Sequence, residues 1–206
     1  MGLLNELIEQ YGYNEPIFTQ EIVYKSYSKP WLYKELNRLC EQGLLVRFDK
    51  GIYYIPKQTP LGPSLLDPRK VIRKKYVQNG EKTVGYYAGN TLLNLMNLST
   101  QMPNNIEVYT NNEKAKLREV KIGNHCVVLR RTRTPVTNAN VAVLQFLEMM
   151  NITNASFFDE DRKAAVNRYI KDNAITQDKV TAYAPVFPDR AMRNLIESGV
   201  VYSVAP

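Results

Sequence analysis

A single amphipathic stretch, residues 27–42 with the sequence YSKPWLYKELNRLCEQ, most constrains what this chain can fold into. Its apolar side chains recur at the spacing of one helical face and form a stripe of Leu32, Leu36, Leu39 and Cys40. Ser28 is a favourable N-cap residue, Pro30 suits the first helical turn, and Gly43 is the residue type that commonly follows a helix end. The pattern predicts a helix that begins after Ser28 and ends before Gly43.

The opposite face of this helix is basic, polar and aromatic. It carries Lys29, Trp31, Lys34, Asn37, Arg38 and Glu41. A helix that is anchored by leucines and presents such a face suits insertion into the major groove of DNA. An ordinary surface helix has the same stripe, so the neighbouring segments have to decide between the two interpretations.

Two shorter helices are predicted before it. Apolar residues at helical spacing over residues 3–11 end at Gly12, and Thr19 is a candidate N-cap for a second helix that ends near residue 25. Residues 26 and 27 then turn the chain into the leucine-striped helix. Three short helices with a tight turn before the third are the helix-turn-helix arrangement.

A β-hairpin is predicted directly after the third helix. Residues 44–48 and 52–55 have strand composition, and Asp49, Lys50 and Gly51 form the turn between them, with glycine at the left-handed position. A hairpin in this place is the wing of a winged helix-turn-helix domain. Its tip is expected to contact the sugar-phosphate backbone.

The next segment combines a Pro- and Gly-rich connection with a basic helix. Residues 58–66 predict a linker or a tightly turned connection, and Asp67 with Pro68 then begins a helix that continues to Asn79 and Gly80. Five cations lie within seven residues of it: Arg69, Lys70, Arg73, Lys74 and Lys75. Such cations repel one another unless an anion is close, so a phosphate-contacting face and a solvated basic face both remain open.

The rest of the chain mixes strand and helix patterns. Strands are expected at residues 83–87, 106–109, 117–122, 125–130 and 200–204, and helices at 91–96, 164–170, 180–183, 190–198 and from residue 140 onward. The sequence therefore predicts an α+β protein. Its winged helix-turn-helix is followed by a mixed α+β domain with a small antiparallel sheet and C-terminal helices.

Charge is distributed unevenly along the chain. The formal net charge is +7, which indicates a polyanionic partner. Residues 1–57 carry seven basic and seven acidic side chains, residues 58–135 carry thirteen and five, and residues 136–206 carry seven and eight. Because the excess lies in the middle, we expect the second domain to supply much of the phosphate affinity and of its salt dependence.

The sequence favours a binding protein over an enzyme, with no metal or cofactor. Cys40, Cys126 and His125 do not form a zinc-ligand set, no glycine pattern forms a phosphate-binding loop, and no apolar run is long enough to span a membrane. Without a secretion signal, the chain is expected in the cytoplasm. Glu119 and Lys121 fit the E-x-K part of a metal-dependent nuclease signature, and a nuclease that uses them stays open as an alternative.

Several short stretches share a family pattern. The first group of stretches consists of Phe18-Thr19, LNRL from Leu36, GLLVR from Gly43 and KGIYY from Lys50. A second group follows it, GYYAGNTLLNLMNLSTQMP from Gly85 and VYTN from Val108. Together they resemble the AbiEi-like antitoxins, which are bacterial abortive-infection regulators of type IV toxin–antitoxin systems. The resemblance covers residues 15–135, and residues after 140 are only loosely similar.

The resemblance implies a repressor that binds inverted repeats of double-stranded DNA in its own operon and counters a nucleotidyltransferase-like toxin. It divides the chain into a DNA-binding domain at residues 1–57, a linker at 58–66 and an antitoxin-like α+β domain at 67–206. The candidate DNA-binding residues are Tyr27, Ser28, Lys29, Trp31, Lys34, Asn37, Arg38, Arg47, Lys50, Tyr53, Arg69, Lys70, Arg73, Lys74 and Lys75. A winged-helix module that binds proteins without binding DNA is a further alternative.

Overall fold

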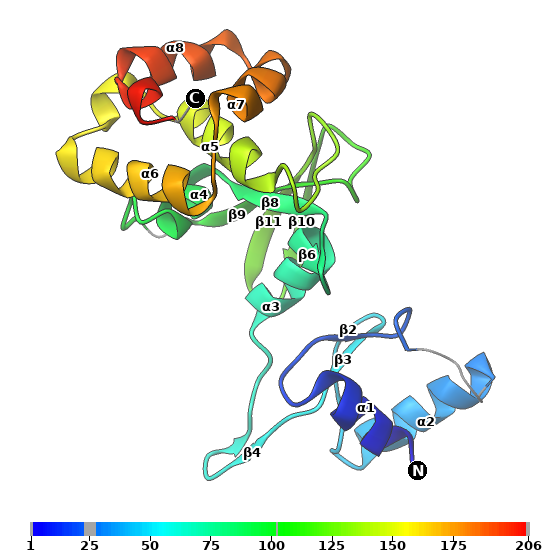
Figure 1. Ribbon diagram of the computed structural model, residues 1–206. Helices are drawn as coiled ribbons and strands as arrows, with labels where there is room; N and C mark the ends of the chain where they lie inside the picture. The colour runs from blue at the N-terminus through cyan, green and yellow to red at the C-terminus, as the bar shows by residue number, and fades with distance from the viewer. Residues whose placement is uncertain (1, 23–27, 102, 205–206) are drawn as a thin grey trace. The chain divides into compact units, whose positions relative to one another are not determined.

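The protein has an α+β architecture with helices at its C-terminus, as the sequence predicts. Figure 1 shows the elements of the computed structural model, which describes residues 2–22, 28–101 and 103–204. The chain divides into two compact units, residues 1–74 and residues 75–206. Within the described ranges, no helix is both long enough and apolar enough to cross a lipid bilayer.

The first unit contains a small sheet and three helices in its described part. Its elements are α1 (Leu3–Tyr11), β1 (Ile17–Phe18), α2 (Lys29–Glu41), β2 (Val46–Asp49), β3 (Ile52–Tyr54), β4 (Gln58–Thr59), β5 (Gly62–Pro63) and α3 (Pro68–Ile72). The three-stranded sheet has the order β1-β3-β2, and both pairings are antiparallel. Leucines from α1 and α2 pack with residues of β1 and β3 in one hydrophobic core.

The second predicted helix does not begin at Thr19, because residues 19–22 form a turn. Phe18 pairs with Ile52 of β3, and Thr19 donates from its backbone N–H and from its hydroxyl to the carbonyl of Gly51, at 3.0 and 3.2 Å. The hairpin thereby gains a third strand, and the hydroxyl that could cap a helix is used in the sheet. The predicted end of that helix and the turn after it, residues 23–27, lie outside the described residues.

The third predicted helix is confirmed as α2, with both of its predicted ends. Ser28 is the N-cap residue, although its side chain makes no capping hydrogen bond. At the other end the N–H of Gly43 donates to Cys40 and the N–H of Leu44 to Leu39, which is the Schellman arrangement. Gly43 has φ +70°, the left-handed conformation that this arrangement requires.

The predicted linker, residues 58–66, contains a tightly turned connection in which β4 and β5 form a two-stranded hairpin. The Asp67 carboxylate then caps α3 by accepting the N–H of Arg69 at 2.9 Å. After Ile72 the helix continues as the π-helix η1 (Arg73–Val77), and the division between the two units falls inside η1. The hairpin of β6 (Gln78–Asn79) and β7 (Lys82–Thr83) follows.

The second unit is built on a four-stranded sheet. Its strands are β8 (Gly85–Ala88), β9 (Asn105–Thr110), β10 (Leu117–Ile122) and β11 (His125–Arg131), in the order β10-β11-β9-β8. The sequence predicts an antiparallel sheet, and two pairings are antiparallel. The central pair β9–β11 is parallel. β10 and β11 form an antiparallel hairpin, and the strand of this hairpin that lies beside β9 is β11.

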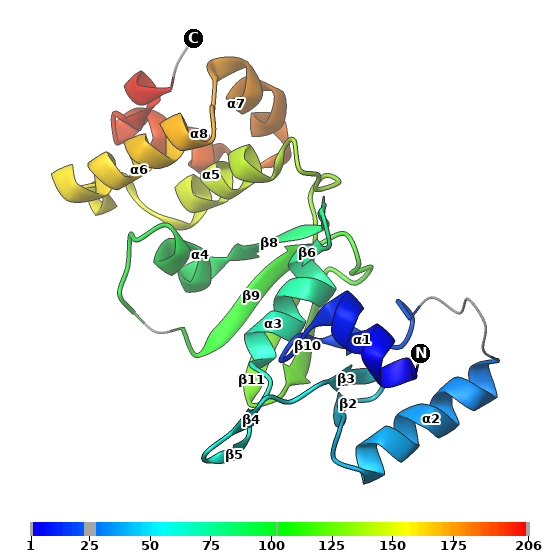
Figure 2. The ribbon, with the colours of Figure 1, turned by 60° about the horizontal axis from the view of Figure 1, so that its bottom comes forward.

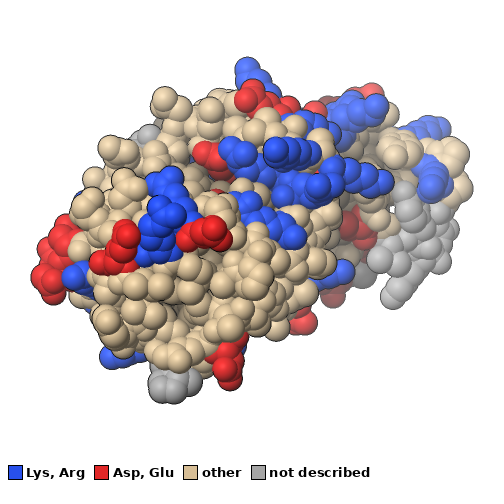
Figure 3. All heavy atoms as spheres, turned by 90° about the horizontal axis from the view of Figure 1, so that it is seen from above, with Lys and Arg blue, Asp and Glu red and all other residues tan. Residues whose placement is uncertain are grey.

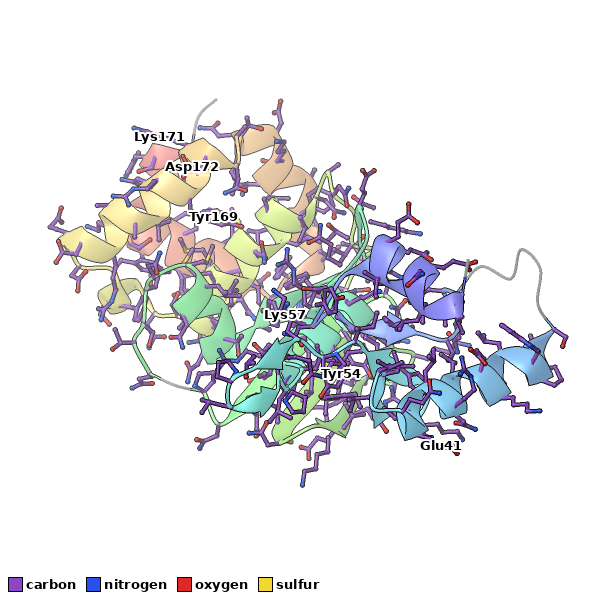
Figure 4. All side chains as sticks on the ribbon, turned by 90° about the horizontal axis from the view of Figure 1, so that it is seen from below. Glu41, Tyr54, Lys57, Tyr169, Lys171 and Asp172 are labelled. Atoms are coloured by element: carbon purple, nitrogen blue, oxygen red, sulfur yellow. The ribbon has the colours of Figure 1, made fainter. Side chains whose placement is uncertain are left out.

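Helices cover one side of this sheet (Figures 1 and 2). They are α4 (Gly89–Leu95), α5 (Val141–Ile152), α6 (Glu160–Asp172), α7 (Gln177–Tyr183) and α8 (Asp189–Glu197), with the short 3-10 helices η2 (Ala155–Phe157), η3 (Ala184–Val186) and η4 (Val200–Ser203). α5 is buried along most of its length. Tyr169 points from α6 toward α5 (Figure 4), where its hydroxyl donates to Gln145 Oε1 at 2.9 Å.

The closing strand predicted at residues 200–204 is wrong. This segment forms η4, in which the N–H of Tyr202 donates to Gly199 and that of Val204 to Val201. η4 packs against two helices, α6 and α8. Val200 and Val204 are both buried, which explains the apolar character of the segment.

Candidate nucleic-acid interface

α2 has one buried face and one exposed face, as its leucine stripe predicts. Leu32, Leu36 and Leu39 are each at most 2% exposed and belong to the first unit's core. The opposite face forms a shallow concavity lined by Trp31, Lys34, Glu35, Asn37, Arg38 and Glu41. The structure therefore brings the predicted side chains of this helix together on one exposed surface, with Glu41 at the C-terminal end of α2 (Figure 4).

The N-terminal end of α2 is suited to an anion. Its first turn contains no acidic residue and begins with Lys29 and Pro30, and the Ser28 side chain makes no capping hydrogen bond. The helix dipole makes such an end favourable for phosphate. Tyr27, the predicted neighbour of this end, lies outside the described residues.

Arg38 is already engaged by an acid of its own helix. Its Nε donates to Glu35 Oε2 at 2.9 Å, its Nη2 bonds to the other oxygen, and Nη1 donates to Gln42 at 3.4 Å. The hydrogen bond from Arg38 lowers the pKa of Glu35 below its ordinary value. Sequence reasoning did not single out Glu35, although its spacing of three residues from Arg38 is the signal for such a pair.

The predicted β-hairpin is present as β2 and β3, with Gly51 in the left-handed conformation at φ +73°. Arg47 and Lys50 are exposed, and the Asp49 carboxylate accepts the N–H of Lys50 at 2.7 Å, which stabilises the turn. Tyr53 does not fit the predicted phosphate contact, because it is only 4% exposed and packs in the hydrophobic core. Burial also raises the pKa of Tyr53.

The five cations of α3 and η1 have different surroundings. Lys70 pairs with Glu15, while Lys74 pairs with Glu21 at 2.7 Å and lies over the ring of Tyr11 at 4.8 Å. These lysines attach α3 to the rest of the first unit, which is a different role from the predicted phosphate contact. The other three, Arg69, Arg73 and Lys75, are exposed.

Net charge is shared between the two units. Residues 1–74 carry eleven basic and eight acidic side chains, net +3, and residues 75–206 carry sixteen and twelve, net +4. The unit that contains α2 is therefore not neutral once α3 is counted with it. On the face shown in Figure 3, Lys and Arg side chains gather in one area.

The nuclease fragment lies on an exposed strand. Glu119 and Lys121 project from β10. Val128 of β11 pairs with Glu119 on one side and with Glu107 of β9 on the other, so one strand lies between the two glutamates. Glu107 is paired with Arg130 at 3.1 Å. Among the described residues, no three His, Cys, Asp or Glu side chains come together in a group that could hold a metal ion.

Comparison with known proteins finds a family whose model matches the chain. Residues 6–174 match the model of a family described as "Family of unknown function (DUF6088)". The match begins in α1 and ends after α6, so it includes the candidate interface and the four-stranded sheet. No curated protein matches the chain.

Proposed function

The chain belongs to this family of unknown function, DUF6088, and from its own side chains we propose that it binds double-stranded DNA sequence-specifically as a transcriptional repressor. One observation carries the proposal. The exposed face of α2 holds Lys34, Asn37 and Arg38 on a helix whose other face is fully buried, and a hairpin with exposed Arg47 and Lys50 follows it in the same unit.

The proposed roles follow from the chemistry of these groups. Arg, Lys and Asn side chains on a helix can donate to the base edges that distinguish sequences in the major groove. Lys34, Asn37 and Arg38 are assigned to this role. Arg47 and Lys50 on the wing, with Lys29 at the start of α2, are assigned to phosphates, which fix orientation without reading sequence.

Selection from random duplexes at two salt concentrations tests the proposal. Wild type is expected to enrich one motif, while Lys34→Ala and Arg38→Ala lose preference at individual positions by about ten- to hundredfold. Lys50→Ala is expected to weaken all duplexes about equally. Lys171→Ala, an exposed lysine on α6, is the matched control and should leave both motif and affinity unchanged.

The alternatives give different results in the same assay. A protein-interaction module would shift no duplex, and its partners would be insensitive to Lys34→Ala. A nuclease would cleave DNA in the presence of Mg²⁺, and Glu119→Ala would abolish the cleavage. Either result would refute the repressor proposal.

The resemblance to AbiEi-like antitoxins extends the proposal. In that extension the chain acts in the bacterial cytoplasm, represses its own operon at an inverted repeat and counters a nucleotidyltransferase-like toxin encoded beside it. Co-expression with an adjacent nucleotidyltransferase-like gene tests this part. Growth that the chain does not rescue would remove the antitoxin role and leave DNA binding in place.

A further inference from the structure

A shallow, open depression lies at one edge of the four-stranded sheet, within the second unit. It has a volume of about 520 Å³, and its lining includes Asn111, Glu113, Lys114, Arg131, Arg133 and Thr134. The parallel strands β9 and β11 end here, at Thr110 and Arg131, which are partners in register. The carboxyl ends of neighbouring parallel strands commonly hold ligands, because the loops that leave them bring side chains together.

Asn111 ties the two loops of this edge site to each other. Its amide nitrogen donates to the carbonyl of Val136 at 2.8 Å, and its oxygen accepts the N–H of Val136 at 2.9 Å and the hydroxyl of Thr132 at 3.1 Å. A single side chain thus joins the segment after β9 to the segment after β11. The walls of the site are therefore held in place before any ligand arrives.

Glu113 orders the first loop, and its negative charge is paired with Arg118. It is 7% exposed, and its Oε1 accepts the N–H groups of Lys114 and Ala115 at 2.9 and 3.0 Å. Its Oε2 lies 2.7 Å from Arg118 Nε. The backbone hydrogen bond from Ala115 is the largest reason why the pKa of Glu113 is below its ordinary value.

Two cations of the edge site have no acidic partner. Arg133 is paired with a buried glutamate, whereas Lys114 and Arg131 are exposed and make no side-chain ion pair or hydrogen bond with another residue in the described ranges. Their charges therefore face the site uncompensated. A guanidinium and an ammonium in a concave site are a favourable combination for phosphate oxygens.

We propose that the edge site binds a small ligand that bears a phosphate group. Arg131 and Lys114 are its charge partners, and the hydroxyl of Thr134 is a further donor. The site is open, and its volume lies within the roughly 300–1,000 Å³ of small-molecule sites. This site goes beyond the proposed DNA interface, because none of its residues belongs to the first unit.

Calorimetry on the full chain, without DNA, tests the proposal with inorganic pyrophosphate and with ATP as probes. Arg131→Gln and Lys114→Gln are each expected to weaken binding about tenfold, as loss of a charge-assisted hydrogen bond does. Arg168→Gln and Lys171→Gln on α6 remove the same charges from exposed positions and serve as matched controls. Both controls should bind within about twofold of wild type.

Three results would overturn the proposal. The first is no binding of either probe by wild type up to about 10 mM. The second is an equal loss in the α6 controls, which would make the effect one of net charge. The third is a loss of duplex affinity in Arg131→Gln without any effect on the probes, which would assign the site to the DNA backbone. Because the probes are measured without DNA, failure here is distinguishable from failure of the DNA-binding proposal.

Discussion

Arg38 shows how one neighbour can set the strength of a proposed contact. Its guanidinium is held by Glu35, so binding to a base or phosphate has to displace or share that carboxylate. Glu35→Gln removes the negative charge and releases the guanidinium. We expect the affinity for duplex DNA to rise about three- to tenfold, measured by fluorescence anisotropy in low salt.

Glu9→Gln separates this local effect from the general loss of one negative charge. Glu9 is exposed on α1, which does not contribute to the concavity of α2. The control should change affinity by less than twofold. An equal gain in both variants would show that Glu35 does not restrain Arg38.

A second residue pair, Arg133 with Glu148, links stability of the second unit to pH. Arg133 Nη2 lies 3.1 Å from Glu148 Oε2, and its guanidinium is 5.0 Å from the ring centroids of Tyr109 and Phe187. Glu148 is 3% exposed, and burial raises its pKa above the ordinary 4.5 while Arg133 opposes the shift. A carboxyl with a raised pKa contributes stability below its unfolded pKa and loses that contribution as pH rises through its folded pKa.

Arg133→Gln is therefore expected to destabilise the protein more at pH 8 than at pH 5. Without Arg133 the pKa of Glu148 rises further, and at pH 8 its charge is buried without a partner. We expect a loss of about 3 kcal/mol in the free energy of unfolding at pH 8 and a smaller loss at pH 5, measured by denaturant titration.

The double variant Arg133→Gln/Glu148→Gln is the control for this pH effect. It has no carboxylate at position 148, so its deficit relative to wild type should change less between pH 5 and pH 8 than that of Arg133→Gln. A pH-independent deficit in Arg133→Gln alone would mean that the residue acts through packing on its two aromatic neighbours.

At the scale of elements, α3 with η1 combines structural and exposed cations. Lys70, which is exposed, and Lys74, which is partly buried, pair with acids of the first unit, whereas Arg69 and Lys75 form no ion pair within the described residues. If the segment contacts DNA, Arg69→Gln/Lys75→Gln should reduce the slope of log affinity against log salt by about two, with little change in stability. The measurement is a salt titration of duplex binding with the full chain.

The matched pair Lys70→Gln/Lys74→Gln should have the opposite effect. Lys74 is partly buried and contacts Glu21 and the rings of Tyr11 and Phe18, so its loss should lower the free energy of unfolding by about 1–2 kcal/mol. The salt slope should stay unchanged. A reduced slope here would mean that these lysines leave their partners to contact phosphate.

At the scale of the whole molecule, each of the two units has a hydrophobic core cluster of its own. Leu36 is fully buried in the core of the first unit, and Leu147 is fully buried in the core that α5 forms in the second. Units with their own cores commonly unfold in separate steps. We therefore expect two transitions on denaturant unfolding.

Leu36→Ala and Leu147→Ala assign these transitions. Each substitution removes the same buried atoms and should lower the stability of its own unit by about 2–5 kcal/mol, shifting one transition and leaving the other in place. Circular dichroism and the fluorescence of Trp31, which lies in the first unit, report the two steps. One transition that both variants shift equally would show that the units unfold together.

The leucine stripe of α2, its Ser28 and Gly43 ends and the wing turn at Gly51 follow from the sequence by itself. Each depends on residues only a few positions apart, so local periodicity and turn chemistry are sufficient to predict them. The exposed candidate face of α2 follows as well, because it is the complement of the leucine stripe on the same helix.

Only the tertiary structure decided which residues of distant segments contact one another. Thr19 bonds to Gly51, Tyr53 is buried in the core, and Lys74 pairs with Glu21, although sequence patterns assign these three residues to a helix cap and to phosphate contacts. The partners are more than thirty residues apart in the first and third cases. A polar or aromatic side chain suits either role, and the choice depends on which segments the folded chain brings beside it.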